Sequence, residues 1–134
     1  MQDLNLAALL REALALSGCS EQQIGQFDAH SPIELVFDDL PSLHMAMLDD
    51  DVWCWSSLGE FNARTQEHFA AALFEFQLEG WAFARTGQLQ FLHDDSELQL
   101  RVLLSREALS GARPLAEAID SYIERLLALR ELLR

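Results

Sequence analysis

Residues 43–57 have the sequence LHMAMLDDDVWCWSS, and this stretch decides the fold class. Alternating apolar residues on both sides of the aspartates at 49–51 predict two short strands around an acidic turn. Successive side chains of a strand point to opposite faces, so Trp53 and Trp55 share one face and Cys54 lies on the other. Large aromatic residues on a sheet face are usually core residues, but they are also enriched in interfaces. The two indoles therefore require either a helix of this chain or a partner to cover them.

The elements predicted around this hairpin follow the order α-β-β-β-α-β-β-α. Asp3 and Thr65 are the expected N-caps of the first two long helices, and Gly18 and Gly80 follow their expected ends. Pro114 suits the first turn of the last helix. We predict a helix at residues 4–17, a helical turn at 20–24, strands at 33–37, 43–48 and 52–57, a break at 40–42, and a helix between the cap Thr65 and the stop Gly80. Strands at 88–93 and 97–105 and a last helix whose first turn contains Pro114 complete the prediction. These elements predict a single α/β (α+β) domain over residues 1–134, with a small antiparallel sheet packed by helices.

Composition restricts the partners of the chain. Half of its 134 residues are apolar, and 22 acidic residues against nine arginines, with no lysine, give a formal net charge of −13. An acidic surface repels phosphate groups, so this charge disfavours nucleic acids and anionic membranes as partners. It favours a basic or amphipathic protein segment.

The N-terminal stretch lacks the basic region of a signal peptide, and Asp3, Arg11 and Glu12 interrupt its apolar residues. No stretch of the sequence has the roughly 18 uncharged apolar residues that a membrane span needs. Cys19 and Cys54 are the only cysteines, too few for a disulfide framework. We therefore expect a cytoplasmic protein without membrane insertion.

The sequence contains no motif that indicates catalysis. It has no nucleophile elbow, no glycine-rich phosphate loop and no His-x-x-x-His pair. We expect His44 to be a partly exposed strand residue and Cys54 to be a buried structural thiol. The aspartates at 49–51 are expected to form a solvated turn rather than a metal site, because consecutive carboxylates do not converge on one ion. We therefore expect no catalytic residue, no metal site and no cofactor.

Seven short segments are weak signals alone but specific in their common order and spacing. They are Ser17-Gly18-Cys19, Phe27-Asp28-Ala29-His30-Ser31, Leu40-Pro41-Ser42, Asp49-Asp50-Asp51-Val52-Trp53-Cys54-Trp55, Leu58-Gly59, Phe83-Ala84-Arg85-Thr86-Gly87-Gln88-Leu89 and Glu97-Leu98-Gln99-Leu100. With these segments, nearly the whole chain resembles the invasion protein B/SpaK family of type III secretion chaperones.

The resemblance implies a small, acidic, cytosolic homodimer of α/β fold in a bacterium, which uses no ATP and catalyses no reaction. Members of the family bind the N-terminal region of several secreted effectors, and that region wraps around the dimer in an extended form. Binding keeps the effectors soluble and competent for export, and delivers them to the secretion ATPase.

The residues themselves offer candidates for these surfaces. The first helix is apolar on more faces than one sheet contact uses, and this excess surface is predicted to form an effector groove together with the tryptophan face. An open sheet edge is a further site where an extended peptide can add a strand. The candidate effector-binding residues are Leu6, Leu10, Leu14, Met45, Met47, Trp53 and Trp55. The candidate dimer-interface residues are Phe69, Leu73 and Phe76, and the competing interpretation of these three is ordinary core contact with the sheet.

An acidic immunity-type inhibitor, which binds one toxin by charge complementarity, is the alternative hypothesis. The two functions differ in their effect on the partner, because an inhibitor abolishes its activity and a chaperone leaves its effector domain folded and active. A small enzyme is the least favoured class, since no arrangement of acid, base and nucleophile emerges.

Overall fold

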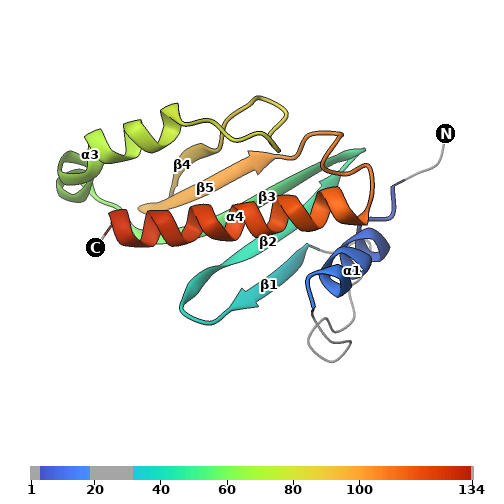
Figure 1. Cartoon of the computed structure of the whole chain (residues 1–134). Helices are drawn as coiled ribbons and strands as arrows, with labels where there is room; N and C mark the ends of the chain where they lie inside the picture. The colour runs from blue at the N-terminus through green and yellow to red at the C-terminus, as the bar shows by residue number, and fades with distance from the viewer. Residues whose placement is uncertain (1–3, 19–31, 134) are drawn as a thin grey trace.

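The described residues of the computed structural model, 4–18 and 32–133, form three helices and five strands (Figure 1). The elements are α1 (Leu6–Leu16), β1 (Ile33–Phe37), β2 (Leu40–Leu48), β3 (Asp51–Glu60), α3 (Ala63–Leu78), β4 (Gln90–Asp94), β5 (Glu97–Leu103) and α4 (Ala112–Leu132). Their order is the predicted one, and the predicted α+β class is confirmed. The helical turn predicted at residues 20–24 and the N-cap predicted at Asp3 lie outside the described residues.

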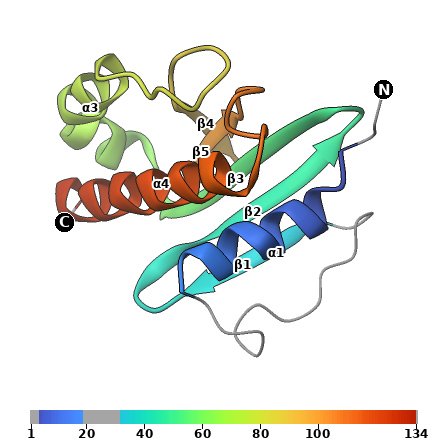
Figure 2. The ribbon, with the colours of Figure 1, turned by 45° about the vertical axis from the view of Figure 1, so that its right-hand side comes forward.

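The strands form one sheet in the order β1-β2-β3-β5-β4, and all neighbouring pairs are antiparallel. Helices α4 and α1 lie against the same face of this sheet (Figure 1 and Figure 2). Within the part of the chain that the structure describes, no helix lies across the opposite face, which we call the outer face. The strand register places on it Glu34, His44, Ala46, Trp53, Trp55, Ser57, Gln90, Leu92, Gln99, Arg101 and Leu103.

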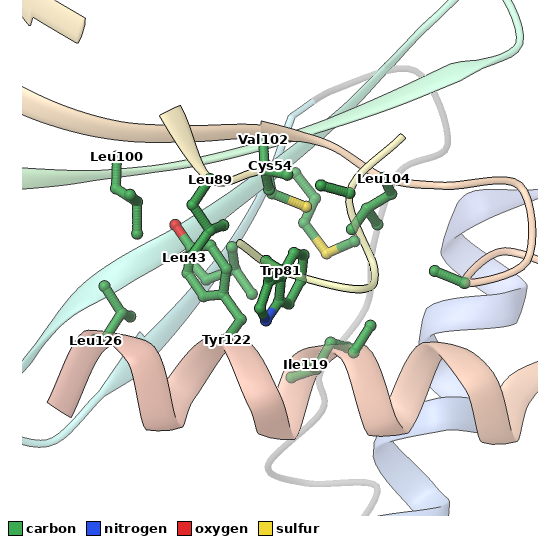
Figure 3. Close-up of a cluster of buried hydrophobic side chains, with 14 of the residues drawn as sticks. Leu43, Cys54, Trp81, Leu89, Leu100, Val102, Leu104, Ile119, Tyr122 and Leu126 are labelled. Carbon is green, nitrogen blue, oxygen red and sulfur yellow. The ribbon is translucent and has the colours of Figure 1, made fainter. Parts of the chain in front are cut away.

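The hydrophobic core lies between α4 and the inner face of the sheet (Figure 3). The predicted alternation in β5 is confirmed, because Leu98, Leu100, Val102 and the following Leu104 are all buried. Helix α4 contributes the buried side chains of Leu115, Ile119, Tyr122, Leu126 and Leu129. Trp81, from the segment between α3 and β4, fills the space between α4 and the sheet (Figure 3).

Two polar groups in this core have partners. The hydroxyl groups of Ser56 and Tyr122 are hydrogen-bonded at 2.8 Å, and both residues are buried. The indole N–H of Trp81 donates to the Ser121 hydroxyl at 2.8 Å. A buried polar group without a partner costs about 1–3 kcal/mol. The first bond therefore joins α4 to β3, and the second joins α4 to the segment between α3 and β4.

The helix ends differ in detail from the prediction. Asn5 caps α1 by accepting from the Ala8 N–H at 3.1 Å. Helix α3 begins three residues earlier than expected, because Asn62 is its N-cap. Thr65 completes a capping box, since its hydroxyl accepts from the Asn62 N–H at 2.8 Å. The predicted ends are confirmed at Gly18 and Gly80, which both adopt the left-handed conformation.

The strand bounds also differ. Strand β2 begins at Leu40 and includes residues 40–42, which were predicted to form a break between the first two strands. The ladder with β1 shifts register between Leu35 and Phe37, and this irregularity accommodates Pro41, which has no N–H for a regular ladder. Strand β3 continues to Glu60 through a second shift after Ser57. Strand β4 begins two residues later, and β5 ends two residues earlier, than predicted.

Candidate functional site

One row of side chains crosses the centre of the outer face from edge to edge. The register pairs its members in the order Glu34, His44, Trp55, Arg101 and Gln90. The His44 ring stacks on the Trp55 indole, with centroids 5.4 Å apart and planes 12° apart. On its other side, His44 Nε2 lies 3.5 Å from a Glu34 carboxylate oxygen. The row therefore holds an aromatic stack between two charged side chains.

Trp53 lies next to this row on the same face. The guanidinium carbon of Arg101 lies over the Trp53 ring, 4.8 Å from its centroid. Both tryptophans are half-buried, whereas Val52, Cys54 and Ser56 point into the core from the same strand. Among the described residues, no helix covers either indole. Of the two alternatives raised by the sequence, a helix of this chain or a partner, the partner is therefore favoured.

An open groove with a volume of about 600 Å³ lies beside Trp53, between the outer face and the end of α3. It is lined by Trp53, Gln77, Gln88, Gln90, Phe91, Leu92 and Arg101. Arg101 carries the only charge among these lining residues. We call this feature the Arg101 groove.

The structure separates the residues that were predicted to bind an effector. Trp53 and Trp55 lie on the outer face, but Met45 pairs with Cys54 and points into the core, as does the partly buried Met47. The α1 candidates are buried as well, on the face opposite to the tryptophans: Leu6, Leu10 and Leu14. The single groove expected between α1 and the tryptophan face therefore does not form. The large apolar side chain that α1 exposes is Leu16, which was not among the predicted effector-binding residues.

The residues predicted for a dimer interface lie on α3. Leu73 and Phe76 are buried, and Phe76 contacts Phe91 of β4 with ring centroids 5.6 Å apart. Phe69 is half-buried. The strongly exposed apolar side chains of this helix are Phe74 and Leu78, with 64% and 63% of their surface accessible. Their spacing of four residues indicates a second apolar face of this helix, which was not predicted from the sequence.

Several acidic residues lie at the two ends of the sheet. The β1–β2 turn and the β4–β5 turn lie at the same end, where the register pairs Glu60 with Glu97. The aspartates at 49–51 form the β2–β3 turn at the other end, where Asp51 pairs with Arg85 at 2.8 Å. The described residues contain no group of three or more metal-ligating side chains placed to hold an ion.

The thiol of Cys54 is buried on the core side of β3. Burial raises the pKa of Cys54 far above its ordinary value, so the thiol keeps its proton. Burial also raises the pKa of Tyr122, against the lowering effect of its hydrogen bond with Ser56. Neither group can act as a base at neutral pH. The helices in the described ranges include none that is long and apolar enough to cross a membrane.

Comparison with known proteins gives a consistent set of relatives. Residues 18–95 match the invasion protein B family. The chain is 37% identical over 122 residues to the surface presentation of antigens protein SpaK of Salmonella typhimurium, which covers 91% of this chain and 90% of that protein. The protein of the same name from Salmonella typhi matches equally well.

A solved structure has a similar fold. It is the heterodimeric complex ExoU–SpcU from the type III secretion system of Pseudomonas aeruginosa, and the match has a TM-score of 0.57. The alignment covers 96% of this chain and 94% of the matched chain, at 15% sequence identity. At this identity the match supports the fold alone.

Proposed function

The chain belongs to the invasion protein B family, and on this basis we propose that it is a type III secretion chaperone that binds the N-terminal regions of secreted effectors. The observation that carries the proposal is the outer face, where Trp53 and Trp55 are half-buried and no described helix covers them. Aromatic residues are enriched at protein–protein interfaces, so two neighbouring indoles on an open sheet face fit a partner.

An extended effector segment has two modes of contact on this fold. It can lie across the outer face, where the indoles supply apolar contact area. It can also add a strand at the edge of β1, which pairs with no second strand among the described residues and where Val36 is strongly exposed. Ordering a disordered segment costs several kcal/mol, so a long contact that uses both modes is expected. In this proposal the bound effector stays soluble, competent for export and available to the secretion ATPase in the cytoplasm.

The proposal includes a homodimer that forms through α3. Phe74 and Leu78 are exposed one turn apart on this helix, which gives an apolar strip without a partner among the described residues. Phe69 packs against the core on the other side of the helix. Each copy carries a net charge of −13, so two copies repel one another over most of their surface. An apolar seam is the contact that tolerates this repulsion. Leu73 and Phe76 support the strip from beneath instead of contacting the second copy.

Co-expression with an effector N-terminal region tests the function. The first hundred or so residues of a secreted effector from the same genome should copurify with the chain, and light scattering after gel filtration should give two copies of the chain per segment. The bound segment should lack globular structure, so a protease should cleave the parts of it that do not contact the chain. Failure of every such segment to copurify would refute the chaperone role.

The second candidate function is an immunity-type inhibitor. It is favoured by the carboxylates at one end of the sheet, in the turns Asp38-Asp39 and Asp94-Asp95 and at the Glu60–Glu97 pair. These would attract a basic toxin surface. An activity assay of the bound partner distinguishes the candidates, since a chaperone leaves the folded effector domain active and an inhibitor does not.

A further inference from the structure

Arg101 lies at the centre of the outer face without a carboxylate beside it. Its register partners are Trp55 on β3 and Gln90 on β4. The face of the Trp53 ring lies 4.8 Å from its guanidinium carbon, so a cation–π contact holds the group in place. Arg101 forms no ion pair with any described residue.

The Nε–H of Arg101 is shielded from solvent and has no hydrogen-bond acceptor in the described structure. The Nε–H of Arg130 is also shielded without an acceptor, but the guanidinium of Arg130 donates to the Asp39 carbonyl oxygen. Arg85 pairs with Asp51, and Arg125 pairs with Glu79. A guanidinium has five N–H donors, and a shielded donor without an acceptor is costly. Arg64, Arg106 and Arg113 also form no ion pair with a described residue, but they are exposed to water. The shielded Nε–H of Arg101 instead calls for an acceptor from outside the chain.

The walls of the Arg101 groove define the chemistry of that acceptor. Three walls are the neutral amides of Gln77, Gln88 and Gln90, and the others are apolar or aromatic. Amides donate to and accept from a peptide backbone, and a guanidinium binds a carboxylate through two parallel hydrogen bonds. No acidic residue lines the groove, so a basic side chain finds no counter-charge there.

We propose that the Arg101 groove is a specificity site that receives a glutamate or aspartate side chain from the bound effector segment. The inference rests on the proposed function and refines it, because it assigns an acidic residue to a ligand that the net charge of −13 would predict to be basic. Trp53 orients the guanidinium, and the three glutamines hold the backbone around the carboxylate. The competing occupant is a second copy of this chain, since the groove borders α3.

Charge-neutralising variants on both partners test the site. The probe is an effector N-terminal segment that copurifies with the chain, together with variants in which each Asp is changed to Asn and each Glu to Gln, one at a time. Isothermal titration calorimetry should find one acidic position whose neutralisation weakens binding about tenfold, the loss expected for a charge-assisted hydrogen-bonded pair. Arg101→Gln should weaken the wild-type segment by a similar factor.

A double-mutant cycle separates direct contact from indirect loss. If the two groups bind one another, Arg101→Gln combined with the critical neutralised segment should be no weaker than either change alone. Arg101→Glu should in turn restore preference for a segment with lysine at that position. Arg106→Gln is the matched control, because Arg106 is exposed and lies outside the groove. Thermal melts should show that each variant remains folded.

Three results would overturn the inference. If Arg101→Gln leaves the affinity of every segment unchanged while the wild type binds, the chaperone role stands and the specificity site does not. If Arg101→Gln shifts the monomer–dimer equilibrium in sedimentation but does not change the affinity of the dimer for a segment, the groove is part of an interface between two copies of the chain. If the two losses add, Arg101 does not contact the critical carboxylate. Absence of binding by the wild-type chain would instead refute the proposed function itself.

Discussion

The three tryptophans of the chain provide a direct test of which sheet face belongs to the core. Trp81 is buried between α4 and the sheet with 4% of its surface exposed, and its indole N–H is bonded to Ser121. Trp53 and Trp55 are half-buried on the outer face. Replacing each by alanine removes the same atoms from different surroundings, so the three variants are matched controls for one another.

The expected stability losses differ by more than the error of measurement. Trp81→Ala leaves a large cavity and should lower the free energy of unfolding by about 3–5 kcal/mol. Trp53→Ala loses a partly exposed cation–π contact of about 0.5–1 kcal/mol and half the burial of an aromatic side chain, about 1 kcal/mol. Trp55→Ala loses its stack on His44 and should cost a similar amount, about 1–2 kcal/mol in all.

Urea unfolding followed by far-ultraviolet circular dichroism measures these losses without depending on tryptophan fluorescence. The protein concentration must be fixed, because the proposed dimer would couple the midpoint to concentration. The two outer-face variants should remain folded and should bind an effector segment at least about tenfold more weakly, the change expected from removing an interface aromatic. If either outer-face variant loses as much stability as Trp81→Ala, the outer face is part of the folded core and the proposed binding surface is wrong.

Three further predictions concern the core and the dimer. Ser56→Ala leaves the buried Tyr122 hydroxyl without its partner and should cost about 1–3 kcal/mol in urea unfolding, while adding Tyr122→Phe should recover part of that loss; equal stability of the single and double variants would contradict this. Phe74→Asp, alone or with Leu78→Asp, should convert the dimer to a folded monomer in sedimentation equilibrium, and a dimer that persists would exclude the α3 seam. Because burial raises the pKa of the Cys54 thiol above its ordinary value of 9.0, the unfolded chain loses this proton first, and wild-type stability should fall as the pH rises above about 9. Cys54→Ala should show a shallower alkaline decrease in the urea midpoint, and an unchanged pH dependence would mean that the thiol is solvated.

The alternation in the sequence predicted which side chains share a sheet face, but not which face the helices cover. On β3 the bulky indoles were the stronger core candidates by size, yet the core side carries Val52, Cys54 and Ser56. The reason lies outside the strand. Trp81 and the Tyr122 ring occupy the space above Cys54 and Ser56, so the core needs small side chains at these positions (Figure 3).

The helices were predicted in the right order, but the exposed sides of α1 and α3 were not. The apolar surface of α1 looked larger than one sheet contact requires, but the helix packs against α4, and its Leu6, Leu10 and Leu14 belong to the buried core. For α3, the sequence located the helix and its apolar stripe, and the structure shows that Leu73 and Phe76 face inward while Phe74 and Leu78 face outward. Periodicity alone cannot assign a direction when a helix has apolar residues on two sides.

The distribution of charge reconciles the acidity of the chain with a cation at the centre of its outer face. The register places the carboxylates of the β1–β2 and β4–β5 turns at one end of the sheet and the aspartates at 49–51 at the other. Between these ends, the Arg101 groove has one positive charge and neutral walls. Exposed charges at the ends act over about 8–10 Å at physiological salt and mainly accelerate the approach of basic flanks of a ligand. A shielded guanidinium at the centre acts only on contact and therefore distinguishes one bound segment from another. A chaperone that accepts several effectors needs both properties, a rim that attracts many segments and a central site that fixes the register of each.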